Sequence, residues 1–146
     1  MGKQTDAHIV TVNTELGKLK KALDDITTDG QAFNTTWAAM MAAYDKGGKT
    51  ASAAFGNTLK ADATKYDNAV ATAKVALTAA DNAVKAMDTF VTAKDRSTIN
   101  PLAKKSIGKA KKFVLAAKAE LLDPAKRLPN KSSMLAAYNS CKNIYY

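Results

Sequence analysis

The chain is poor in the residues from which metal and redox centres are built. Its 146 residues include one Cys, Cys141, and one His, His8. A single thiol excludes an intramolecular disulfide and any zinc or iron–sulfur site that needs several thiolates. Glu occurs only twice, so the Glu-x-x-His motifs of di-iron bundles are absent. We therefore expect no metal, no cofactor, no small-molecule ligand and no enzyme activity.

Long apolar runs and leader sequences are also missing. No run of 18 apolar residues occurs, so we expect no transmembrane segment. The first 26 residues lack the continuous apolar stretch of a secretory signal peptide. Three Pro and seven Gly exclude collagen-like and low-complexity chains. The expectation is one domain, residues 1–146, cytoplasmic by default, with signal-less secretion left open.

What the chain has in abundance is Ala, which fills 29 of its 146 positions and is the best helix former. No segment shows the period-two alternation of a strand. We predict an all-α fold: an up-and-down antiparallel bundle of four main helices with coiled-coil-like heptad seams, plus a short C-terminal helix. The predicted helices span residues 5–28, 31–45, 52–94, 101–122 and 132–143.

Apolar residues with heptad spacing define the predicted seams. In the first helix they are Ile9, Val12, Leu16, Leu19, Leu23 and Ile26. The third and fourth helices place a bulky aliphatic at one seam position and mostly Ala at the other. The first seam position holds Ala63, Val70, Leu77, Val84 and Val91, then Ile107, Val114 and Leu121. The second positions are Leu59, Tyr66, Ala73, Ala80 and Met87, then Ala103, Ala110 and Ala117. Small side chains let two helix backbones approach closely. Sequential long helices joined by a short turn are expected to pack antiparallel.

Local signals predict where the helices end. Thr27-Thr28-Asp29-Gly30 is typical of a helix C-terminus. Gly47-Gly48 predicts a break, and Gly56-Asn57 either a bend or the true start of the third helix. Asp24, Asp25 and Asp29 are expected to pair with lysines or to cap the turn. His8, close to the chain start, is expected at the surface.

The net charge of +9 is unevenly distributed: residues 1–100 carry +1 and residues 101–146 carry +8. The candidate polyanion-binding residues are Lys104, Lys105, Lys109, Lys111, Lys112, Lys118, Lys126 and Arg127. Nearly all are Lys, whereas bidentate phosphate contacts favour Arg. Only Phe113 interleaves with them, which gives little for a base to stack on. The favoured interpretation is that these basic residues keep the protein soluble, and the alternative is that they bind a polyanion.

The segment 31–45 carries a second candidate surface. Trp37, Met40, Met41 and Tyr44 recur at helical spacing on one face. Aromatics and Met on one stripe form either core or a partner-binding surface. Core is the favoured interpretation, because the chain has few other bulky residues to fill a bundle.

Together these patterns predict a non-enzymatic helical-bundle protein that acts through protein–protein interaction or self-assembly, as a scaffold, an adaptor or a secretion-associated component. Long seams can pair between chains as well as within one. The alternative is a polyanion-binding module, for nucleic acid or an anionic membrane surface, that uses the basic face of residues 104–131.

Overall fold

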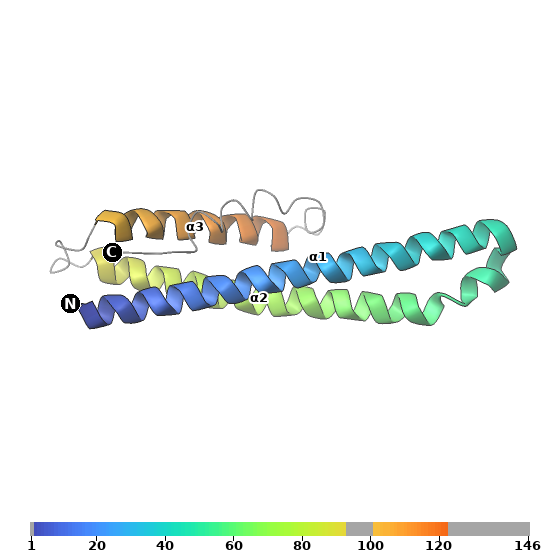
Figure 1. Cartoon of the computed structure of the whole chain (residues 1–146), viewed down its shortest axis with the longest axis horizontal. Helices are drawn as coiled ribbons and strands as arrows, with labels where there is room; N and C mark the ends of the chain where they lie inside the picture. The colour runs from blue at the N-terminus through green and yellow to red at the C-terminus, as the bar shows by residue number, and fades with distance from the viewer. Residues whose placement is uncertain (1, 93–100, 123–146) are drawn as a thin grey trace.

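The structure, a computed structural model, describes residues 2–92 and 101–122. These residues form three helices: α1 spans Gly2–Ala53, α2 spans Gly56–Thr92 and α3 spans Pro101–Leu122 (Figure 1). No strand occurs within these two ranges, which confirms the all-α prediction. The predicted helix 132–143 and Cys141 lie outside the described residues.

Two long antiparallel helices, α1 and α2, form a hairpin that sets the length of the molecule (Figure 1). The chain turns at Gly48, where φ is 71° and ψ is −157°. Only Gly adopts this combination readily. A Cβ at Gly47 would lie 2.7 Å from the Cβ of Ala51, so a side chain at this position would clash with that of Ala51. The predicted break at Gly47-Gly48 is confirmed.

A Cβ at Gly48 is expected to destabilise this turn. The Gly48→Ala variant should lose about 1–2 kcal/mol of unfolding free energy, because an L-residue is strained at this φ and ψ. Gly108→Ala is the matched control: Gly108 lies within α3 and has open space around it. That variant should gain about 0.5–1 kcal/mol through helix propensity. Urea unfolding followed by far-UV circular dichroism tests the opposite signs, and a loss in both variants would contradict the assignment.

The two helices of the hairpin keep one register along their length. The rings of His8 and Phe90 lie 4.7 Å apart between centroids. Further along, Thr36 Oγ1 donates a 2.5 Å hydrogen bond to Asp62 Oδ2. In both pairs the residue numbers add to 98, which centres the register on residue 49, beside Gly48. The glycine turn thus lies where the pairing of the two helices requires it.

The third helix runs antiparallel along only part of this hairpin. Lys111 Nζ of α3 donates a 2.8 Å hydrogen bond to Asp88 Oδ2 of α2. Counting along antiparallel helices from this pair places Leu122, the last residue of α3, beside about Leu77 of α2. Figure 1 shows the result: α3 covers the part of the hairpin next to the N-terminus, and the remainder projects beyond it.

The buried core lies in a region we call the base (residues 7–30, 69–92 and 107–122), and α3 packs along the part of it nearest the N-terminus. All six apolar seam residues of α1, from Ile9 to Ile26, are buried as predicted. Ala73, Ala80, Ala110 and Ala117 have no exposed surface at all. Methyl groups at these positions let the helix backbones approach closely, and the aliphatic residues between them fill the remaining volume.

The remainder of the hairpin, residues 31–68, is a two-helix projection that we call the arm. No apolar side chain within it is fully buried. The predicted seam of α2 reflects this change: Val70, Leu77, Val84 and Val91 are buried, whereas Leu59, Ala63 and Tyr66 keep part of their surface in solvent. The arm is therefore held by one helix against another, without the third helix that closes the core of the base.

Three expectations about the helices are wrong. The predicted helices 5–28 and 31–45 are one continuous helix, because no break occurs at Thr27–Gly30. Gly30 is a buried helical residue rather than a cap, and continuing the helix keeps α1 packed along α2. The third predicted helix begins at Gly56, which corrects the bound at 52 and confirms the alternative that Gly56-Asn57 marks its true start. The described residues therefore hold three helices and not four.

Candidate functional site

The arm exposes a row of large apolar side chains on α1. Trp37 is 48% exposed, Met41 41% and Tyr44 50%, while Met40 is half-buried. The expectation that this face forms core is wrong for the three exposed residues. They do lie on one side of a helix, but α3 ends before it reaches them, so no third helix within residues 2–92 and 101–122 covers that side. The structure thus brings the four candidate partner-binding residues together on one projecting surface.

A hollow of about 260 Å³ marks the point where the base gives way to the arm. Phe33 and Tyr66 are its largest lining residues; Gly30, Asn34, Ala63 and Asp67 complete it. Ala63 continues the heptad row of α2 that includes Val84 and Leu77, the row that extends beside α3 in the base. The hollow therefore continues the path of α3. Sequence spacing placed Tyr66 on a seam, but could not show that the seam is open at this level.

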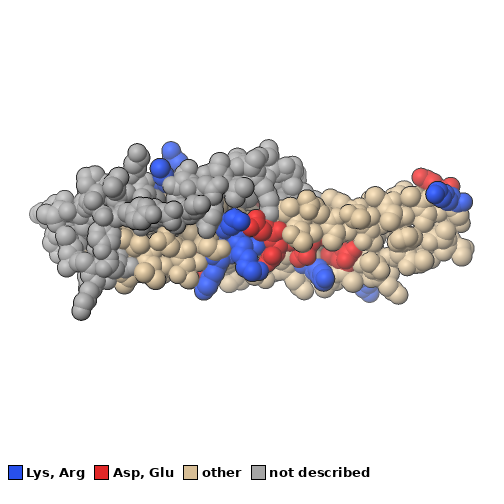
Figure 2. All heavy atoms as spheres, in the orientation of Figure 1, with Lys and Arg blue, Asp and Glu red and all other residues tan. Residues whose placement is uncertain are grey.

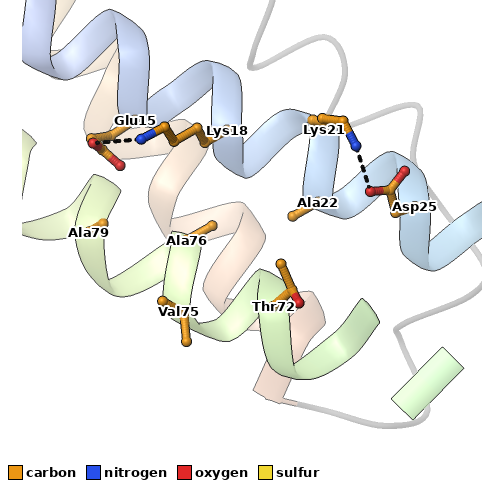
Figure 3. A pocket seen from close by; sticks show the side chains of 9 residues that line it. All are labelled: Glu15, Lys18, Lys21, Ala22, Asp25, Thr72, Val75, Ala76 and Ala79. Atoms are coloured by element: carbon orange, nitrogen blue, oxygen red, sulfur yellow. Dashed lines mark hydrogen bonds and ion pairs between the residues drawn. The ribbon is translucent and has the colours of Figure 1, made fainter. Parts of the chain in front are cut away.

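A second, wider groove of about 580 Å³ lies on the base, between α1 and α2 (Figure 3). Ala22, Ala76 and Ala79 supply small apolar side chains to it. The charged residues in its lining are paired along α1: Glu15 Oε1 lies 3.7 Å from Lys18 Nζ, and Lys21 Nζ donates a 3.0 Å hydrogen bond to Asp25 Oδ2.

These ion pairs stabilise the surface of α1 rather than presenting charge to a ligand. They link residues three or four apart on one helix surface, as solvent-facing pairs commonly do. Asp24 accepts a hydrogen bond from Lys20 in the same way. The expectation that Asp24 and Asp25 pair with lysines is confirmed, and Asp29 lines a further shallow hollow.

The candidate polyanion-binding lysines do not all serve one surface. Lys111 bridges α3 to α2 through Asp88, so this residue has a structural role. Lys112 and Lys118 are exposed, and Lys109 is half-buried. Lys104 and Lys105 lie in the first turns of α3, where only the backbone is described. Lys126 and Arg127 lie outside the described residues.

The aromatic residue among these lysines is not available for stacking. Phe113 is only 1% exposed and forms part of the core. The spacing-based seam of α3 omitted this residue, because it lies one position before Val114. On the face seen in Figure 2, basic and acidic side chains lie next to one another along the hairpin. His8 also differs from expectation: it is half-buried and its ring packs on Phe90.

Residues 2–92 and 101–122 hold neither a metal-ligand cluster nor a helix that could span a membrane. No three His, Cys, Asp or Glu side chains gather there as a metal site would require. None of the helices in these ranges has the length and apolar content needed to cross a membrane. Comparisons of the chain with protein-family models, with curated proteins and with solved structures found no match.

Proposed function

We propose that this is a non-enzymatic protein that acts through protein–protein contact, with the arm as its contact surface. One observation carries the proposal: the row Trp37, Met41 and Tyr44 is exposed on a projection that α3 does not reach. Aromatics and Met are enriched at the centres of protein interfaces, where their burial contributes most of the affinity. Single exposed apolar residues are ordinary, whereas a contiguous row on a projection is typical of an interaction site.

The arrangement suits a scaffold or adaptor. The base contains the buried core, and so it supplies the stability that the fold requires. Along α1 the arm extends about 27 Å beyond the base, at 1.5 Å per residue over residues 31–49, and α2 contributes about 18 Å of helix from Gly56 onward. A contact surface at this distance can bind a partner helix without disturbing the core. The polyanion alternative has less support, because Lys111 is engaged with Asp88 and Phe113 is buried.

Site-specific photo-cross-linking in the cells that make the protein tests the proposal. A photoreactive phenylalanine analogue replaces Trp37, Met41 or Tyr44 on the arm. The matched controls carry the same analogue in place of Val10, Val75 or Leu115, which are more exposed but lie on the base. We expect cross-linked protein products of defined mass from the arm positions, at several times the yield from the controls. Equal yields from arm and base would contradict the proposal.

A further inference from the structure

We propose that the occupant of the arm is a second copy of this chain, whose own arm packs antiparallel on the first so that four helices form a bundle. This inference rests on the proposed function of the arm and names its partner. The arm has two helices and one apolar side that no other described residues cover, and a second arm brings the same two helices and the same side. A two-fold axis then closes the assembly at two copies.

The order of side chains along the arm favours this pairing. Trp37, Met40, Met41 and Tyr44 form a row with an aromatic residue at each end and two methionines in the middle. The row is symmetric about the midpoint of Met40 and Met41, so an antiparallel two-fold places Trp37 across from Tyr44 of the partner subunit. The methionines of the two copies then meet at the axis. Offset aromatic pairs and sulfur–aromatic contacts are both favourable arrangements.

The charge distribution points the same way. The arm contains four Lys (Lys46, Lys49, Lys60 and Lys65) and three Asp (Asp45, Asp62 and Asp67). Its net charge is therefore +1, and the rest of the chain carries the other +8. Two arms meet with little repulsion, whereas two basic regions do not. Antiparallel arms also hold the two bases at opposite ends of the assembly, which keeps the like charges far apart.

The dimensions of the arm leave room for such a contact. Two helices side by side, each about 10 Å wide, with about 27 Å of α1 and about 18 Å of α2, present a face of about 450 Å² per copy. The total of about 900 Å² is below the area of a stable, permanent interface and fits a weak, transient one. The tip of the partner's arm would reach the hollow lined by Phe33 and Tyr66. We therefore expect a reversible dimer with a dissociation constant in the micromolar range.

The experiment is sedimentation equilibrium of the purified full chain between about 1 and about 100 µM, which spans the expected dissociation constant. The expected mass rises with concentration from 15.5 kDa toward twice that value. Trp37 is the only Trp, so its emission reports on the arm directly. Its maximum should move to shorter wavelength as the mass rises.

Two arm variants and one control make the result specific. Trp37→Ala should weaken dimerisation at least tenfold, which corresponds to about 1.4 kcal/mol. Met41→Glu should keep the chain monomeric up to about 100 µM, because the two-fold brings both added carboxylates together. Leu115→Ala, at an exposed position on α3, should dimerise like the parent. Circular dichroism confirms that each variant is folded.

Other outcomes overturn the inference in distinguishable ways. A monomer at every concentration with a Trp37 emission maximum typical of water excludes the second copy. If arm cross-linking then still captures a different protein, the proposed function stands without this partner. A monomer whose Trp37 emission is blue-shifted at every concentration means that the chain itself covers the arm, which also excludes the second copy. If the arm variants dimerise as tightly as the parent, the interface lies elsewhere.

Discussion

The free energy of unfolding of the Phe113→Ala variant is expected to be about 3–5 kcal/mol lower than that of the parent chain. Phe113 is 1% exposed and is the largest of the fully buried side chains. Removing the ring leaves a cavity in the base that neighbouring side chains fill only in part, and the lost apolar contact adds to the cost. Because α3 packs chiefly on α2, the loss should weaken the attachment of α3 first.

Urea unfolding followed by far-UV circular dichroism measures this effect, with Leu115→Ala as the matched control. Leu115 lies two residues further along the same helix and is 65% exposed. Its truncation should change the unfolding free energy by about 0.5 kcal/mol or less. Equal losses in the two variants would show that Phe113 does not pack in the core.

The second large effect is expected from Ala80→Leu in α2. Ala80 has no exposed surface, and the methyl groups around it allow the helices to approach closely. Three further heavy atoms at this position force the helix axes apart or push side chains off their rotamers. We expect a loss of about 3 kcal/mol, at the upper end of the usual cost of overpacking.

The control for Ala80→Leu is Ala86→Leu, on the exposed side of the same helix. Leu and Ala have similar helix propensities, so this variant should stay within about 0.5 kcal/mol of the parent. Thermal unfolding of both variants tests the difference. A neutral Ala80→Leu would mean that bulky side chains rather than methyl groups set the spacing between the helices.

The base is the part of the fold that sequence periodicity predicts well. The heptad spacing from Ile9 to Ile26 identified buried residues, because two faces of one helix differ in their contact with water. The Ala positions of α2 and α3, such as Ala80 and Ala117, were predicted for the same reason. The predicted seam omitted Phe113 because α3 buries residues at more than the two heptad positions that define that seam.

The arm shows what periodicity leaves out. The spacing of Trp37, Met41 and Tyr44 identifies one face of a helix, but not whether a neighbour covers that face. Coverage depends on where α3 ends, and so on a contact between residues far apart in sequence, such as Lys111 and Asp88. The predicted break at Thr27–Gly30 failed for a related reason. Packing along α2 outweighs a local preference for ending the helix there.

The separation of base and arm has a consequence for how such a protein can change. Under the proposed function, substitutions at Trp37 or Tyr44 would change which partner the arm binds, while the residues that form the buried core lie in another part of the molecule. In many proteins stability and function compete, so that improving one is costly to the other. Here the two requirements fall on different stretches of the hairpin, so specificity can be redesigned, by selection or in the laboratory, at small risk to the scaffold.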